Sequence, residues 1–148
     1  MPARLRSSKA VRGPRGPVDA AGCPYCAWVA GDLVSIIRRY SFEAAHKLDW
    51  HPGKCRSLHG HSYVLEVEVT GPVGEHGVVM DFAELDTVVE ECVVSRLDHT
   101  YLNDLLDNPT AELVASAVGG WLDEAAIGWS VLRLWETERG SVVVRRTG

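Results

Sequence analysis

The sequence is poor in cysteine, methionine and phenylalanine, and it contains no long hydrophobic run. Its 148 residues include four cysteines, two methionines and two phenylalanines. No apolar segment reaches the length that crosses a membrane, and the basic N-terminal region lacks the hydrophobic core of a signal peptide. Without an export signal, the cysteines are expected to be free thiols or metal ligands and not a disulfide framework. We therefore expect a cytoplasmic protein without a membrane partner.

Two further absences limit the function. No G-x-G-x-x-G motif follows a predicted strand, so the sequence does not indicate a nicotinamide site. The formal net charge is −5, but residues 1–20 carry five basic side chains and one acidic side chain, which is +4 and leaves −9 for the remainder. Such an acidic body argues against nucleic acid as the main partner. The length fits one domain with a real core.

Residues 1–33 differ in composition from the rest of the chain. They are rich in arginine, serine, proline, glycine and alanine without sustained periodicity, so we expect a disordered leader before a folded domain at residues 34–148. The C-P-Y-C segment, Cys23 to Cys26, could be half of a zinc knuckle or a redox pair. No second ligand pair is near it, so we interpret it as part of a dispensable leader. As an alternative hypothesis, the natural chain begins at Val34, with a valine codon as the initiator.

From residue 34 onward, some segments have apolar residues at every second position, as in strands, and others have them at helical spacing. Alternation predicts strands at residues 34–46 and 61–71, and again at 129–137 and 141–146. Helical spacing predicts one helix capped by Asp81 and a second with Asn108 as its N-cap and Pro109 as its first residue. Gly119 and Gly120 are expected to weaken or break the second helix. The order ββααββ predicts an α+β fold with two helices on one face of a four-stranded antiparallel sheet.

Three histidines fall where they could meet. His59 and His61 are two apart at the entry to a strand, so their side chains share a face. His46 ends the preceding strand, and pairing of the two strands would bring it beside them. Three imidazoles with an open fourth position are typical of a catalytic zinc site. Isolated histidines are more often surface or core residues, which is our interpretation of His51 and His76.

Cys55 stands four residues before His59 and admits two interpretations. It could be the fourth ligand of a closed structural site. Alternatively, Lys54 and Arg56 flank the thiol and would favour its thiolate form, which suits a reactive cysteine. The sequence alone leaves both interpretations open. On the apolar stripe of the first helix, Cys92 is expected to be an inert core thiol.

The motifs, taken together, resemble a known family. Within residues 35–146 the chain contains, in order, F-E-A-A-H, C-x-x-x-H-G-H, M-D-F-A-E-L, L-D-H-T-Y-L-N, N-P-T-A-E and W-E-T. This succession is similar to that of the 6-pyruvoyltetrahydropterin synthase superfamily, and most similar to its 6-carboxytetrahydropterin synthase branch in queuosine biosynthesis. The three-residue gap between Cys55 and His59 is typical of that branch. The resemblance implies a tunnelling fold (T-fold), commonly assembled as a homo-oligomeric hexamer, and an exposed sheet edge on each side favours such association.

The resemblance implies a role for each motif residue. The zinc ligands would be His46, His59 and His61, and the catalytic cysteine would be Cys55. A second set of residues would handle protons and the pterin ring: the pair Asp98 and His99, the pterin-anchoring Glu136, and Thr110 and Glu112 of N-P-T-A-E. Thr110 and Glu112 suit the start of a helix equally well, and Asp98 and His99 could merely cap a loop. Trp135 stands where the family often has lysine.

The implied reaction uses Zn²⁺ and a small-molecule pterin substrate, 7,8-dihydroneopterin triphosphate. The products would be 6-carboxy-5,6,7,8-tetrahydropterin, triphosphate and acetaldehyde, feeding queuosine or another 7-deazapurine. Three alternatives stay open: 6-pyruvoyltetrahydropterin synthase activity, a zinc hydrolase with three histidine ligands, and a non-catalytic zinc scaffold. A hydrolase would have no need of the thiol at Cys55.

Overall fold

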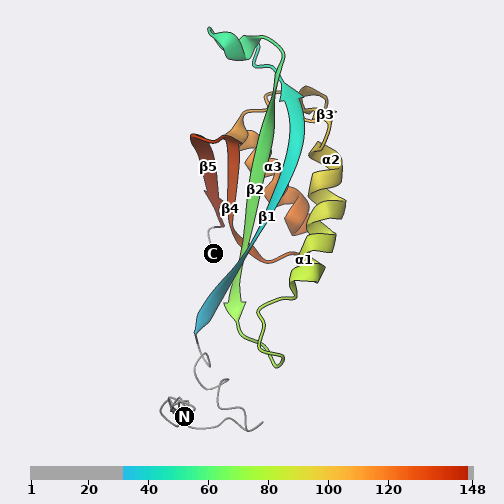
Figure 1. Ribbon diagram of the computed structural model, residues 1–148, viewed down its shortest axis with the longest axis vertical. Helices are drawn as coiled ribbons and strands as arrows, with labels where there is room; N and C mark the ends of the chain where they lie inside the picture. The colour runs from blue at the N-terminus through green and yellow to red at the C-terminus, as the bar shows by residue number, and fades with distance from the viewer. Residues whose placement is uncertain (1–31, 147–148) are drawn as a thin grey trace, which may run out of the picture.

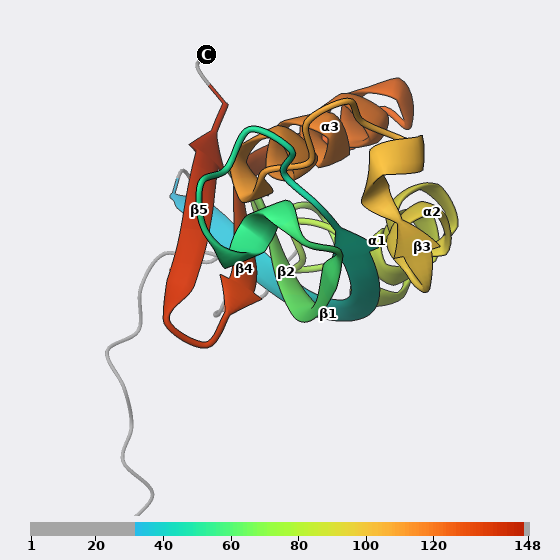
Figure 2. The same cartoon turned by 90° about the horizontal axis from the view of Figure 1, so that it is seen from above.

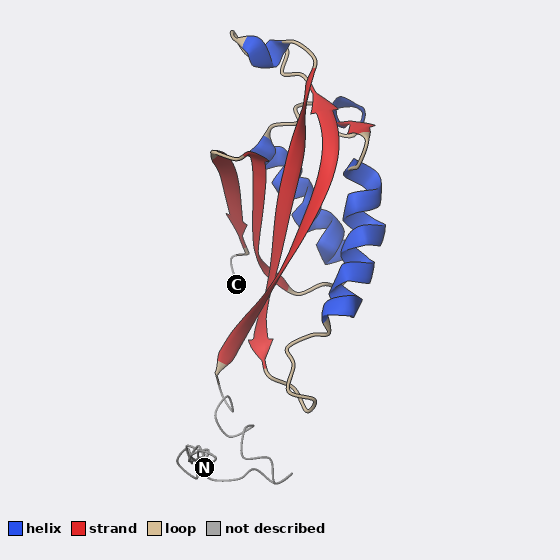
Figure 3. Ribbon diagram, in the orientation of Figure 1, coloured by secondary structure: helices blue, strands red, loops and turns tan. Residues whose placement is uncertain are grey.

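The structure is a computed structural model that describes residues 32–146. It forms one five-stranded sheet with the order β3-β1-β2-β4-β5, and the helices cover one face of this sheet (Figures 1 and 2). Figure 3 distinguishes the strands in red from the helices in blue. The strands are β1 (Leu33–His46), β2 (His59–Pro72), β3 (Thr100–Tyr101), β4 (Trp129–Thr137) and β5 (Gly140–Arg145), and the main helices are α1 (Phe82–Val89), α2 (Ser95–Leu97) and α3 (Ala111–Glu124).

The two long strands follow the predicted alternation. β1 and β2 pair antiparallel along their whole length, with Phe42 opposite Tyr63 and His46 opposite His59. The buried residues of each strand are two apart and face the helices, because successive side chains of a strand point to opposite faces. The largest fully buried side chains on β1 and β2 are Phe42, Tyr63 and Leu65. This alternation confirms the strand pattern predicted for residues 34–46 and 61–71.

The predicted four-stranded antiparallel sheet is wrong in one respect, because the sheet is mixed and has a fifth strand. β3 pairs parallel with β1 at Ala44 and Ala45. Two residues are too few to show an alternating pattern, so the sequence carried no sign of this strand. The backbone N–H of His99 donates to the carbonyl of Glu43 at 2.6 Å, and the carboxylate of Asp98 accepts from the N–H of Glu43 at 2.9 Å. These bonds hold the connection against the edge of β1.

The first helix begins where predicted but is not a uniform α-helix. The side chain of Asp81 caps it by accepting from the N–H of Ala83. A π-helical segment, Glu90–Val94, lies between α1 and α2. The buried residues recur every fourth position, at Leu85, Val89, Val93 and Leu97. A regular α-helix has 3.6 residues per turn and would rotate such a stripe away from the sheet, so the wider π turn keeps it on one face.

Two predictions for the second helix are wrong. Its N-cap is Thr110 and not Asn108, since the Thr110 side chain accepts from the N–H of Leu113, and its first residue is therefore Ala111 and not Pro109. The helix α3 also runs unbroken through Gly119 and Gly120. Gly119 is buried against β4, where an added Cβ would lie 2.8 Å from Cζ2 of Trp129. Close packing of the helix on the tryptophan therefore requires a residue without a side chain at this position.

The remaining elements match the prediction closely. β4 has the predicted bounds, and β5 begins and ends one residue earlier than expected. Cys92 is partly buried and packs against the core, and burial raises the pKa of its thiol. The C-P-Y-C segment lies outside the described residues. Within the part of the chain that the structure describes, every helix is too short or too polar to cross a membrane.

Candidate metal centre and active site

The three predicted histidines meet at one end of the sheet, beside the helix-facing core. His46 comes from the end of β1, and His59 and His61 come from the start of β2. Their ligand atoms all lie within 4.8 Å of one another, and Nε2 of His46 is 3.1 Å from Nε2 of His59. The predicted convergence of these side chains is confirmed. It arises because the strand register places His46 directly opposite His59.

The backbone determines which ring nitrogens are free to bind a cation. Nδ1 of His46 lies 2.8 Å from the carbonyl oxygen of Pro109, and Nδ1 of His59 lies 2.8 Å from that of Ser57. A carbonyl only accepts hydrogen bonds, so each Nδ1 carries the proton and each Nε2 presents a lone pair. Two lone pairs 3.1 Å apart repel each other. A cation between them would turn this repulsion into attraction.

The third histidine also fits a metal. Nε2 of His61 is buried without a hydrogen-bond partner among the described residues. Burial lowers the pKa of His61 and favours the neutral ring that binds metals. Zinc–nitrogen bonds of about 2.0–2.1 Å at tetrahedral angles would place two ligand nitrogens about 3.3 Å apart, close to the observed separation of His46 and His59. The geometry and the donor set therefore suit a divalent cation such as Zn²⁺.

Glu136 lies beside this histidine cluster. Its Oε1 is 3.5 Å from Nε2 of His46 and 3.8 Å from Nε2 of His61. The carboxylate comes from the end of β4, the strand next to β2. It also lines a cavity of about 360 Å³. Glu136 thus connects the histidines to a space that could hold a small molecule.

Cys55 lines the same cavity as Glu136. It lies in a 3-10 helix, Lys54–Arg56, within the connection from β1 to β2, and its carbonyl accepts from the N–H of Leu48 at 2.8 Å. The thiol is half-buried and is not among the three side chains whose ligand atoms cluster. This arrangement suits a thiol that faces a ligand better than one that closes a metal site.

Thr110 and Glu112 line this cavity as well. The Thr110 hydroxyl also caps α3, and Glu112 lies in the first turn of that helix, where a negative charge is favourable. Both residues therefore belong to the start of the helix and also line the cavity. The carbonyl of Pro109, one residue before Thr110, is the one that orients His46, so the start of α3 contacts the histidine cluster and lines the cavity.

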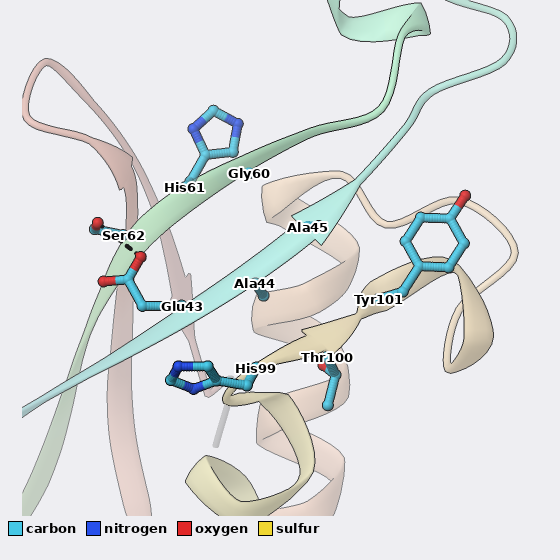
Figure 4. A pocket seen from close by; sticks show the side chains of 9 residues that line it. All are labelled: Glu43, Ala44, Ala45, Gly60, His61, Ser62, His99, Thr100 and Tyr101. Atoms are coloured by element: carbon cyan, nitrogen blue, oxygen red, sulfur yellow. Dashed lines mark hydrogen bonds between the residues drawn. The ribbon is translucent and has the colours of Figure 1, made fainter.

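Asp98 and His99 form a pair but lie away from Cys55. Nδ1 of His99 is 2.9 Å from Oδ2 of Asp98, and His99 has a positive φ of 57°, which is costly for a residue with a side chain. The pKa of Asp98 is lowered, first by the hydrogen bond from the Glu43 backbone and then by His99. His99 is exposed and lines a separate open pocket of about 520 Å³, together with His61 (Figure 4). Within one chain, the structure does not bring this pair into the cavity with Cys55.

Comparison with known proteins assigns the family. Residues 35–147 match the family described as 6-pyruvoyl tetrahydropterin synthase. This match covers most of the chain and all the residues of the site. The protein belongs to the 6-pyruvoyl tetrahydropterin synthase family.

Several members of this family are similar to the chain. It is 43% identical over 99 residues to a 6-carboxy-5,6,7,8-tetrahydropterin synthase of Synechocystis, covering 62% of this chain and 77% of that protein. It is 45% identical over 92 residues to a dihydroneopterin monophosphate aldolase of Pyrococcus furiosus, covering 60% and 71%. The structure of Caenorhabditis elegans 6-pyruvoyl tetrahydropterin synthase superimposes with a TM-score of 0.70 at 26% identity, covering 78% of this chain and 96% of that one. The α+β fold of the family is therefore confirmed.

Sequence reasoning missed three groups that surround the site of this family member. The carbonyls of Pro109 and Ser57 orient two of the histidines, but a backbone carbonyl has no signature in a sequence. Tyr63 received no role within the strand predicted at residues 61–71, yet its hydroxyl lies buried without a hydrogen-bond partner among the described residues. A tyrosine two residues after His61, on the same face, was the signal that could have indicated it.

Proposed function

We propose that this protein is a metal-dependent lyase that acts on 7,8-dihydroneopterin triphosphate. With one water, the substrate would give 6-carboxy-5,6,7,8-tetrahydropterin, triphosphate and acetaldehyde. The observation that carries the proposal is the shared cavity of Cys55 and Glu136, with Glu136 beside the three histidines. A thiol and a carboxylate therefore line one small space, and the carboxylate also lies beside a histidine cluster that could hold a metal. The relative from Synechocystis is named 6-carboxy-5,6,7,8-tetrahydropterin synthase, which supports the choice of this reaction.

The resident metal in this proposal is Zn²⁺, held by His46, His59 and His61. When bound, zinc would act as a Lewis acid toward the two hydroxyl oxygens of the substrate side chain. The protein contributes the orientation of the ligands, because the Pro109 and Ser57 carbonyls hold two of the rings in one tautomer. A fourth position would remain open for substrate, as in other catalytic zinc sites.

In the proposed reaction, Cys55 is the base that removes a proton from the carbon next to the ring. A thiolate is a suitable base at neutral pH when cations lie near it, and Lys54 and Arg56 are its neighbours in the 3-10 helix. Glu136 would accept hydrogen bonds from the amino group and a ring N–H of the pterin. Thr110 and Glu112 would line the same pterin pocket.

The pair Asp98 and His99 is proposed to move protons during the later steps. Asp98 would orient the imidazole through the bond at Nδ1, which leaves Nε2 free to exchange a proton with a ligand. Because His99 and Cys55 line different cavities of one chain, we propose that His99 of a neighbouring copy completes the site. This arrangement requires a homo-oligomer with active sites near the subunit contacts. A hexamer is the assembly we propose.

A second candidate is an aldolase acting on dihydroneopterin monophosphate, favoured by the relative from Pyrococcus furiosus. Both reactions break a carbon–carbon bond in the side chain, and both need a proton to be moved at a side-chain hydroxyl. A third possibility, favoured by the Caenorhabditis elegans structure, is a 6-pyruvoyl product that keeps all side-chain carbons. The three reactions differ in the carbons that stay on the ring.

Product analysis separates these candidates. The zinc-loaded protein is incubated with 7,8-dihydroneopterin triphosphate and, separately, with the monophosphate, and the pterins are identified by mass spectrometry. We expect 6-carboxytetrahydropterin with one equivalent each of triphosphate and acetaldehyde. A 6-hydroxymethyl pterin from the monophosphate would instead establish the aldolase, and a three-carbon side chain would establish the pyruvoyl enzyme. The product could then enter queuosine or another 7-deazapurine.

A further inference from the structure

Tyr63 has a buried polar group that the fold does not use. Its side chain is fully buried on β2, and its hydroxyl has no hydrogen-bond partner among the described residues. A buried hydroxyl without a partner costs free energy, because the bonds it makes to water in the unfolded chain are lost. Such a group in a native protein therefore requires a specific explanation.

Packing does not explain the hydroxyl. The ring of Tyr63 stacks on Phe42, with centroids 4.9 Å apart and planes inclined by 11°. A phenylalanine at position 63 would make the same stack without the cost. Tyr40 offers a contrast on the neighbouring strand, because it is also buried but its hydroxyl donates to Oδ1 of Asp86 at 2.9 Å.

The surroundings of the hydroxyl point to Glu136. Val64 is paired with Trp135, so the same register places Tyr63 opposite Glu136 on the helix-facing side of the sheet. After burial, Glu136 is the group that raises the pKa of Tyr63. In this structure the Glu136 carboxylate is turned toward His46 and His61. Tyr63 is not among the residues that line the cavity, so it would reach a ligand there through Glu136.

We propose that Tyr63 is a positioning residue whose hydroxyl donates a hydrogen bond to the Glu136 carboxylate when a pterin occupies the cavity. The stacked ring fixes the position of the donor, and the donor then holds one carboxylate oxygen while the carboxylate faces the pterin. The proposal rests on the proposed function, since it assumes that Glu136 binds a pterin. It extends that function by assigning Tyr63 as the residue that orients Glu136, the proposed pterin anchor.

Binding of a substrate fragment tests the proposal without turnover. The full-length, zinc-loaded protein is titrated with 7,8-dihydroneopterin, which lacks the triphosphate leaving group, and Kd is measured by calorimetry. The variants are Tyr63→Phe, Glu136→Gln, the double variant and Tyr40→Phe. We expect Tyr63→Phe to weaken binding about tenfold, the size expected for one hydrogen bond to a charged group. In the Glu136→Gln background the same change should alter Kd less than twofold.

Stability and metal content complete the test. We expect Tyr63→Phe to keep its zinc and to melt no lower than the wild type, because the hydroxyl has no hydrogen-bond partner among the described residues of the substrate-free protein. Tyr40→Phe should melt lower and bind dihydroneopterin normally. An unchanged Kd for Tyr63→Phe, or an equal loss in both backgrounds, would overturn the role of Tyr63 and leave the proposed function standing. Wild-type protein that does not bind dihydroneopterin would overturn the proposed function, and this inference with it.

Discussion

At the scale of single residues, the site brings together two ring nitrogens that carry no proton. Nε2 of His46 and Nε2 of His59 are 3.1 Å apart, and backbone carbonyls keep the proton of each ring on Nδ1. This arrangement is unfavourable for the metal-free protein unless a proton or a cation is shared between the rings. Metal binding would therefore supply part of the folding free energy at this end of the sheet.

The first prediction concerns this histidine cluster. Replacing His46 by alanine should abolish stoichiometric zinc binding and activity together, because only two ligands would remain. His76→Ala, in the exposed turn after β2, is the matched control and should bind zinc normally. Zinc is measured by inductively coupled plasma mass spectrometry after dialysis against a weak chelator. Full zinc occupancy in His46→Ala would remove His46 from the site.

The second prediction concerns the thiol that shares a cavity with Glu136. Cys55→Ala should keep its zinc, its fold and its affinity for dihydroneopterin, and should lose turnover by about 10²-fold or more, as expected when a positioned base is removed. Cys92→Ala, whose thiol packs against the core, should retain activity. Zinc content and kcat are compared for both variants. A zinc-free, destabilised Cys55→Ala protein would instead make Cys55 a structural ligand, and a fully active one would make it a bystander.

At the scale of elements, the contact between α3 and β4 depends on which of two neighbouring glycines faces the sheet. Gly119 faces Trp129, and the indole Nε1 donates to the Gly119 carbonyl at 3.2 Å and to Oδ1 of Asp123 at 3.0 Å. The next residue, Gly120, is exposed, and an added Cβ there meets nothing within 4 Å. The same substitution should therefore have opposite effects at neighbouring positions.

The third prediction uses this difference. Gly120→Ala should stabilise the protein by about 1 kcal/mol, because alanine is the better helix former. Gly119→Ala gains the same propensity but forces a Cβ against a rigid, buried ring, and overpacking of this kind costs about 1–3 kcal/mol. We expect a net loss of stability, measured as a lower midpoint of urea unfolding. Equal stabilisation by both substitutions would show that Trp129 can move aside.

At the scale of the whole molecule, the sheet has open edges. β5 is one edge, and β1 is the other along most of its length, because β3 pairs only with Ala44 and Ala45. Exposed apolar side chains lie on both edge strands, Ile37 on β1 and Val143 on β5. Unpaired edges with apolar residues promote pairing with another chain. The separation of Cys55 and His99 into two cavities is a second reason to expect assembly.

The fourth prediction is a homo-oligomer larger than a dimer. Light scattering after size exclusion should show it for the wild type, and Ile37→Lys with Val143→Lys should reduce its mass and activity together, because charges on edge strands oppose pairing. Leu113→Lys, exposed on α3, is the control for added charge. Mixing inactive Cys55→Ala and His99→Ala proteins under conditions that exchange subunits should restore part of the activity. A stable, fully active wild-type monomer would contradict the prediction.

The sequence by itself determined the helices, four of the strands and the convergence of the three histidines. These features depend on local periods, because alternation assigns one face of a strand and the spacing of His59 and His61 puts both rings on that face. The cap at Asp81 was indicated in a similarly local way, by the residue types at the start of the first helix. The roles of Cys55, Asp98, His99 and Glu136 came from the resemblance to the family, and they stay predictions.

Only the tertiary structure decided the features that depend on neighbours distant in sequence. The short strand β3 exists because Asp98 and His99 bond to Glu43, and the helix tolerates Gly119 because Trp129 packs there. The carbonyls that orient His46 and His59 carry no residue signature. The pairing of β2 with β4, continued by one residue beyond Val64 and Trp135, sets Tyr63 opposite Glu136, and the connection from β1 to β2 brings Cys55 to the cavity that Glu136 lines. Each of these contacts joins backbone or side-chain atoms whose positions are set by packing, and no local period of the sequence encodes them.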